Sequence, residues 1–137
     1  MTDVEARHRA LHDTEIELEV PAAGEYLSVL RTAAAGLAAR MDFTLDDIED
    51  LRIAVDEASS MLLAQANPGT RLRCRFVLGD DTVTFSASVR TSRPQLPSKE
   101  GFAWTVLTAV ASSVDVRLSE PDLLTIELTR QRPASRG

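Results

Sequence analysis

The stretch TLDDIEDLRIAVDEASSMLL, residues 44–63, decides the fold because it predicts one long helix with a single apolar stripe. Thr44 stands three residues before an aspartate, the arrangement of a capping box at a helix N-terminus. Apolar residues then recur at spacings of three and four: Ile48, Leu51, Val55, Ala58 and Leu62. The tripeptide Asn-Pro-Gly at 67–69 stops the helix. This pattern places one continuous apolar stripe against a core.

The segments on either side of this helix predict five strands and two further helices. Alternating apolar and polar side chains indicate strands, and apolar spacings of three and four indicate helices. The expected strands are 14–20, 71–78, 82–89, 114–118 and 123–130, and the expected further helices are 24–41 and 102–113. This order predicts an α+β fold, a two-layer sandwich of a largely antiparallel sheet with helices on one face. Residues 14–130 form one domain, between an expected flexible arm (1–13) and an expected flexible tail (131–137).

Composition indicates a soluble, intracellular, globular chain. The 137 residues are 44% hydrophobic and 26% charged, which is ordinary for such proteins. The net charge of −6 argues against direct DNA binding, because affinity for phosphates comes from clustered Lys and Arg. Cys74, the single cysteine, excludes an internal disulfide and a CxxC motif, and its strand position predicts a buried core residue. With no apolar run long enough to span a membrane, we expect a cytoplasmic protein.

Acidic side chains gather on the 44–63 helix and have two interpretations. Four near its N-terminus are expected to form a solvated face that the helix dipole favours: Asp46, Asp47, Glu49 and Asp50. Asp56 and Glu57 lie in the third turn, and Glu57 precedes Ala58 of the apolar stripe. A carboxylate at the edge of a buried face can act as a general base or bind a cation of a partner.

The other candidates favour structural roles. His8 and His12 have the i, i+4 spacing of metal ligands, but no third ligand is evident, so no metal site is expected. Phe102 and Trp104 are expected to be core aromatics of their helix. The arginines of strand 71–78 are interpreted as the solvent face of an edge strand, with docking of an acidic partner as the alternative. No phosphate-binding loop, dinucleotide motif or nucleophile elbow occurs.

Residues 47–63, DIEDLRIAVDEASSMLL, resemble the N-box helix of the RsbW-type anti-sigma factors, which have the GHKL (histidine-kinase-like, Bergerat) ATPase fold. The resemblance covers nearly the whole domain, and the segments LRIAVDEAS and GFAWTVLTAVA look closest to actinobacterial members. It implies a protein that binds an alternative sigma factor and keeps it from RNA polymerase. Many such proteins also phosphorylate a serine of an anti-anti-sigma factor with Mg-ATP, and the unphosphorylated antagonist frees the sigma factor.

The resemblance gives roles to individual positions of the nucleotide site. Glu57 falls at the general base of phosphoryl transfer, and Met61 replaces the asparagine that coordinates magnesium. Thr91 begins the segment that replaces the adenine-binding aspartate and its DxGxG motif. Magnesium needs hard oxygen ligands, and phosphates need backbone N–H groups that glycine lets approach. We therefore expect a degenerate nucleotide site and no cofactor. ATP and magnesium would be bound only if this degenerate site is still functional.

The resemblance also gives roles to residues of the glycine-rich box, the last strand, the first helix and the first strand. Gly101 and Ala103 stand in its GxGL box, where one of two glycines remains, and Thr125 matches a threonine that contacts adenine in some members. Arg31 aligns with an arginine used against both sigma factor and antagonist. Because the family dimerises through its sheet edge and first strand, residues 14–20 are expected in a homodimer interface.

Three functions follow from the resemblance. The leading one is an anti-sigma factor with impaired ATP binding that an anti-anti-sigma factor releases by partner switching. The alternative is an active serine/threonine kinase of the same family. A third is a scaffold that binds only anti-anti-sigma proteins.

Overall fold

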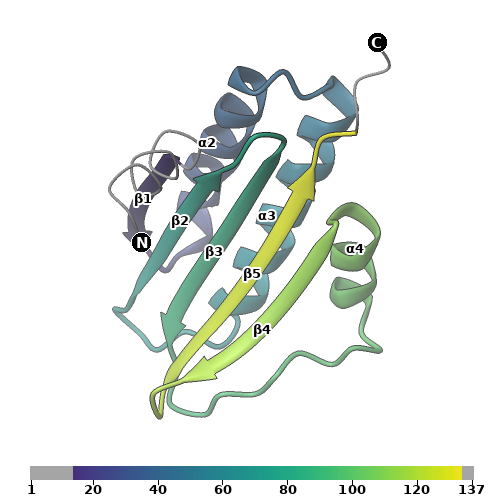
Figure 1. The fold of residues 1–137 in the computed structure, drawn as a ribbon. Coiled ribbons are helices and arrows are strands. Elements are labelled where there is room, and N and C mark those ends of the chain that lie inside the picture. Colours follow the sequence, from purple (N-terminus) through teal and green to yellow (C-terminus); the bar gives the residue numbers. More distant parts are fainter. Residues whose placement is uncertain (1–13, 134–137) are drawn as a thin grey trace, which may run out of the picture.

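The computed structural model describes residues 14–133, which form one five-stranded sheet covered on one side by helices (Figure 1). In chain order the elements are β1 (Thr14–Pro21), the 3-10 helix η1 (Gly24–Tyr26), α2 (Leu27–Arg40), α3 (Leu45–Leu63), β2 (Arg71–Leu78), β3 (Thr82–Arg90), α4 (Phe102–Val110), β4 (Ser113–Ser119) and β5 (Leu123–Gln131). The predicted α+β architecture is confirmed. The expected arm with His8 and His12, and residues 134–137 of the expected tail, lie outside the described residues. Within 14–133 no helix combines the length and apolar character that crossing a membrane requires.

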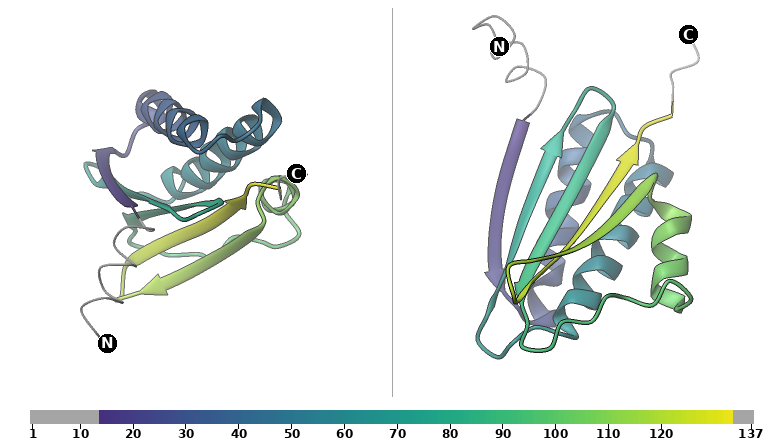
Figure 2. Two further views of the ribbon diagram at one scale, coloured as in Figure 1. Left: turned by 45° about the horizontal axis from the view of Figure 1, so that its top comes forward. Right: turned by 60° about the horizontal axis from the view of Figure 1, so that its bottom comes forward.

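The sheet is antiparallel throughout, with the strand order β1-β2-β3-β5-β4. The last strand of the chain, β5, therefore lies between β3 and β4, and α4 connects β3 to the outer strand β4. Helices α2 and α3 cover one face of the sheet, and α4 packs beside α3 (Figure 2). Among the described residues, the opposite face carries no helix and is open to solvent.

The core lies between the sheet and the helices, and alternation along the strands supplies it. Phe76 of β2 and Phe85 of β3 are paired in register, with ring centroids 5.0 Å apart and planes tilted by 48°. The predicted stripe of α3 faces them, and four of its members are fully buried: Leu51, Val55, Ala58 and Leu62. In α2, Ala34 and Ala38 are fully buried, and such small residues let α2 and α3 approach closely.

Thr44 caps α3 as predicted, but Asp47 does not belong to the solvated acidic face. Thr44 Oγ1 accepts from the Asp47 backbone N–H at 3.2 Å and donates to Asp47 Oδ2 at 2.7 Å. Arg130 Nη2, arriving from β5, donates to Asp47 Oδ1 at 2.6 Å, and Asp47 is only 4% exposed. The prediction of a solvated Asp47 was wrong because its partner lies 83 residues away in the sequence.

Two predicted helices are shorter in the structure. Ala23 offers no capping side chain and Gly24 is a weak helix former, so the first turn is the 3-10 helix η1 and α2 begins after it. Helix α4 ends at Val110 because Ser112 donates its backbone N–H to the Thr129 carbonyl oxygen at 2.7 Å, which starts the β4–β5 pairing.

The prediction that β2 is an edge strand was also wrong. Strand β1 pairs with β2 along its whole length, so β1 and β4 are the edges. The arginines of β2 lie on the open face, where Arg71 Nε is 2.9 Å from Glu19 Oε1 and Arg75 Nη1 is 3.4 Å from Glu15 Oε1. The arginines of β2 therefore form cross-strand ion pairs with the glutamates of β1.

Phe102 lies outside the core, contrary to the prediction. Leu107 is the fully buried residue of α4, and Phe102, five positions earlier, points about 140° away from it around the helix. Phe102 is accordingly 83% exposed. Trp104 is half-buried, with Lys99 Nζ 5.9 Å from its ring centroid.

Candidate partner-binding and nucleotide site

Helix α3 places Glu57 and Met61 one turn apart on the same side. Both are half-buried, as expected for residues at the edge of the apolar stripe. The Glu57 carboxylate makes no hydrogen bond or ion pair with any residue of 14–133, so it is available to an outside group. The Met61 side chain packs against the core and presents only a thioether sulfur, a weak acceptor.

The segment after β3 is bound to the C-terminal end of α3. Asn67 Oδ1 accepts from the backbone N–H of Ser92 at 2.8 Å and from its hydroxyl at 2.7 Å. Gln65 donates to the Gln95 carbonyl oxygen and accepts from the Gln95 backbone N–H, both at 2.7 Å. Thr91, 2% exposed, donates its backbone N–H to the Asp122 carbonyl oxygen at 2.9 Å. The N–H groups of residues 91, 92 and 95 are thus already bonded to protein oxygens.

Gly101 has a local structural reason to be glycine. It is the N-cap residue of α4, and its N–H donates to the Ser98 carbonyl oxygen at 3.1 Å. A Cβ at this position would stand 3.3 Å from that same oxygen, which is closer than most such contacts. The glycine is therefore explained by the tight turn before α4, whether or not a phosphate binds there. Ala103, in the first turn of α4, is half-buried.

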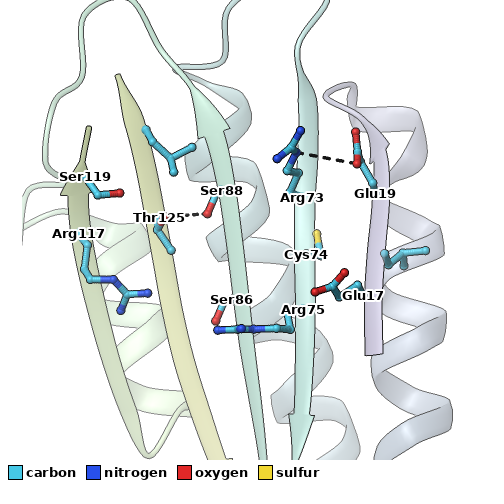
Figure 3. Close-up of a pocket in the computed structure, with 12 residues that line it drawn as sticks. Glu17, Glu19, Arg73, Cys74, Arg75, Ser86, Ser88, Arg117, Ser119 and Thr125 are labelled. Carbon is cyan, nitrogen blue, oxygen red and sulfur yellow. Dashed lines mark hydrogen bonds and ion pairs between the residues drawn. The ribbon is translucent and has the colours of Figure 1, made fainter. Parts of the chain in front are cut away.

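Thr125 is separated from the other candidate nucleotide residues by the sheet itself. Its hydroxyl bonds to Ser88 Oγ at 2.7 Å on the open face of the sheet (Figure 3). Glu57 and Met61 belong to α3, which covers the other face. The prediction that Thr125 joins this site is wrong for this structure. Alternation in β5 contains the signal, because Leu124 and Ile126 point into the core and Thr125 therefore points away.

Two features of this region differ from what a magnesium nucleotide requires. Magnesium prefers oxygen ligands, and Met61 offers only a thioether sulfur at the position where the resemblance implies a magnesium ligand. Phosphate binding needs free backbone N–H groups, and three of those after β3 donate to Asn67, Gln65 and Asp122 instead.

Arg31 lies on α2 at the surface between α2 and α3. Its Nη1 is 2.6 Å from Asp56 Oδ1, and the two side chains are 37% and 35% exposed. Beside it, the outward side of α2 is small and uncharged over three turns: Ser28, Val29, Thr32, Gly36 and Ala39. Sequence reasoning singled out Asp56 but did not connect it with Arg31, since the two are 25 residues apart on different helices.

The open face of the sheet holds a second polar surface. A hollow of about 620 Å³ lies across it, bordered by Arg73 and Arg75 of β2, Arg117 of β4 and Glu17 and Glu19 of β1 (Figure 3). Its basic and acidic groups alternate, and Arg73 Nε is 3.9 Å from Glu19 Oε2. Both signs of charge are present, so this face does not favour an acidic partner alone.

We expect Cys74 to resist thiol reagents in the folded protein. Burial raises the pKa of the Cys74 thiol to about 12, and the residue is 4% exposed, so little of the reactive thiolate forms at pH 8. Reaction with a chromogenic disulfide should be at least about a hundredfold slower for the native protein than for the urea-unfolded protein. Equal rates would contradict the buried position.

The chain is similar to known proteins in both sequence and structure. No protein-family model matches the chain. Over 140 aligned residues it is 32% identical to the anti-sigma-F factor RsbW of Mycobacterium tuberculosis, an alignment that covers 98% of this chain and 83% of that protein. A segment of 52 residues is 44% identical to the serine-protein kinase RsbW of Bacillus thuringiensis, covering 38% of this chain and 32% of that kinase. A crystal structure of the RsbU and RsbW domains of a Mycobacterium tuberculosis protein superposes with a TM-score of 0.64 at 18% identity, covering 88% of this chain and 33% of the other.

The five-stranded antiparallel sheet with helices on one face is thus the histidine-kinase-like fold of RsbW domains. The sequence similarity spans nearly the whole chain. The chain belongs to the RsbW family of anti-sigma factors.

Proposed function

We propose that this protein is an anti-sigma factor that binds an alternative RNA polymerase sigma factor and is released by an anti-anti-sigma factor. The similarity over 98% of the chain to an anti-sigma-F factor carries this proposal. The site occupied by Arg31 supports it, because an accessible guanidinium beside a small, uncharged helix surface suits a protein partner that brings a carboxylate. Such a protein acts in the cytoplasm, where the sigma factor and the polymerase are.

The experiment that tests this proposal is a binding screen. Each alternative sigma factor and each anti-anti-sigma factor of the source genome is purified and titrated calorimetrically into this protein. We expect one sigma factor to bind, and one antagonist to displace it. Binding of an antagonist without any sigma factor would favour a scaffold instead, and binding of neither by folded protein would refute the proposal.

We also propose that ATP binding is impaired. The arguments are the sulfur of Met61 and the occupied backbone N–H groups of residues 91, 92 and 95. Titration of Mg-ATP to millimolar concentration should then give no heat and no rise in melting temperature, because a ligand stabilises only what it binds. Micromolar binding would overturn this part of the proposal and leave the anti-sigma role standing.

An active kinase is the second candidate, favoured by the similarity to a serine-protein kinase and by the free Glu57 carboxylate. Incubation with radiolabelled ATP and the cognate anti-anti-sigma factor distinguishes the two candidates. Phosphate transfer that Glu57→Gln abolishes would establish the kinase. No transfer, with the antagonist still bound, would exclude it.

We further propose a homodimer with β1 in its interface. Strand β1 is an edge of the sheet, and edge strands present unpaired backbone groups that a second chain can pair with. Sedimentation of the wild-type protein should therefore give twice the monomer mass.

A further inference from the structure

The contact between Arg31 and Asp56 joins two helices at the surface. Arg31 is on α2 and Asp56 on α3, and the 2.6 Å distance between Nη1 and Oδ1 is that of a short charge-assisted hydrogen bond. Both side chains are about one third exposed, so the pair stands at the boundary between the packed helices and solvent. The contact fixes where the guanidinium lies relative to both helices.

The pair uses only part of the arginine. Within residues 14–133, Nη1 bonds to Asp56, while Nε and Nη2 bond to no protein atom and are not buried. These two nitrogens carry the parallel N–H groups that bind a carboxylate in a bidentate manner. Asp56 therefore holds the arginine from one side and leaves its carboxylate-binding edge open to solvent.

We propose that Asp56 is a positioning residue, which holds Arg31 so that its Nε–Nη2 edge receives a carboxylate of the sigma factor. The inference rests on the proposed function. An arginine that is free in solution loses rotamer entropy when a partner immobilises it, and this loss weakens binding. An arginine already held by Asp56 loses less. The positioning contact is therefore worth about threefold to tenfold in affinity for the sigma factor.

Substitution of Asp56 tests the proposal against a matched control on the same helix. Asp56→Ala removes the contact, whereas Asp56→Asn removes the charge and keeps an oxygen that accepts from Nη1. Glu49→Ala removes an acid that is 3.2 Å from Arg52 within α3 and does not touch Arg31. Calorimetric titration uses the alternative sigma factors of the source genome with each variant.

We expect Asp56→Ala to weaken binding threefold to tenfold, Asp56→Asn to restore affinity to within about twofold, and Glu49→Ala to leave it unchanged. In an Arg31→Ala background, Asp56→Ala should cause no further loss. Equal or tighter binding by Asp56→Ala would overturn the proposal, since Asp56 would then be neutral or a competitor for Arg31.

A second measurement separates this inference from the proposed function. NMR relaxation of the Arg31 Nε–H group in the free protein should show an ordered side chain in wild type and a mobile one in Asp56→Ala. If no sigma factor binds wild type while this change occurs, the proposed function fails and the positioning contact stands. If Arg31 mobility is the same in both proteins, the positioning role fails whatever binds.

Discussion

Arg130→Met should lower the free energy of unfolding by about 3 kcal/mol or more. This is the largest loss of stability that we expect from breaking any ion pair of the described residues. Arg130 Nη2 lies 2.6 Å from Asp47 Oδ1 and 3.3 Å from Asp50 Oδ2, and its Nη1 donates to the Val110 carbonyl oxygen at 3.0 Å. The Arg130 and Asp47 side chains are 19% and 6% exposed. Methionine fills similar space, but it removes the opposite charge and leaves the buried Asp47 carboxylate with only Thr44 as a hydrogen-bond donor.

Urea denaturation at pH 7 measures this effect. Arg117→Met is the control, because Arg117 is 47% exposed and its ion pairs with Asp115 and Glu127 lie in solvent on the open face. We expect that control to change stability by less than about 1 kcal/mol. A loss below about 1 kcal/mol for Arg130→Met would show that the Asp47 pair does not hold α3, α4 and β5 together.

The same pair predicts how stability depends on pH. Burial alone raises the pKa of Asp47, but hydrogen bonds from Arg130 and Thr44 and the charge of Arg130 outweigh it, so the pKa lies below its usual value. A carboxyl whose pKa is depressed on folding stabilises the fold above its unfolded pKa of about 3.9 and loses this contribution as the pH falls through the folded value. The stability difference between wild type and Arg130→Met should therefore shrink below about pH 4. A difference of the same size at pH 3 and pH 7 would contradict the assignment.

Arg31→Ala should weaken sigma-factor binding by about 30-fold or more, the effect of losing an interface hot spot of about 2 kcal/mol. The affinity of Arg31→Lys for the sigma factor should lie between those of wild type and Arg31→Ala. Lysine keeps the charge but loses the planar guanidinium that binds a carboxylate with two hydrogen bonds. Isothermal titration with the sigma factor identified in the binding screen measures both. Neither substitution should prevent folding, because the Arg31 side chain is 37% exposed and an exposed ion pair contributes little to stability.

Arg73→Ala is the matched control for this prediction. Arg73 is the most exposed arginine among the ion pairs of the described chain, at 73%, and it lies on the open face of the sheet away from α2. It should leave sigma-factor binding unchanged. If Arg73→Ala impairs binding and Arg31→Ala does not, the sigma factor docks on the open face of the sheet.

The elements of the fold were largely predictable because their signals are local. The stripe of α3, the Thr44 cap and the alternation in β2, β3 and β5 all depend on residues within a turn or a strand of one another. Helix ends were less predictable. Helix α4 ends at Val110 because the Ser112 backbone N–H donates to a carbonyl oxygen of β5, and no residue near Ser112 in the sequence indicates this contact.

The candidate site residues were identified through the family resemblance more than through spacing. Glu57 and Met61 lie together on α3, as their i, i+4 spacing requires. The roles of Gln65 and Asn67 were not predicted, although both residues follow α3 closely. Their spacing does not indicate which backbone groups they bind, since these groups lie about 25 to 30 residues away in the sequence. Their amides explain why the segment after β3 has no free N–H groups at residues 92 and 95.

By itself, the sequence determined the class of fold, the faces of the strands and of α3, and the family of the protein, since periodicity and motif similarity are carried by neighbouring residues. Only the tertiary structure decided which charges meet. Asp47 finds Arg130 across 83 residues, and Asp56 finds Arg31 across 25. A charge interacts with whatever the packed chain brings within a few ångströms, and sequence distance does not determine that separation. Hence the acidic N-terminal end of α3, which was expected to be solvated, contains the buried carboxylate of Asp47, and Asp56 further along the helix pairs with the candidate binding arginine.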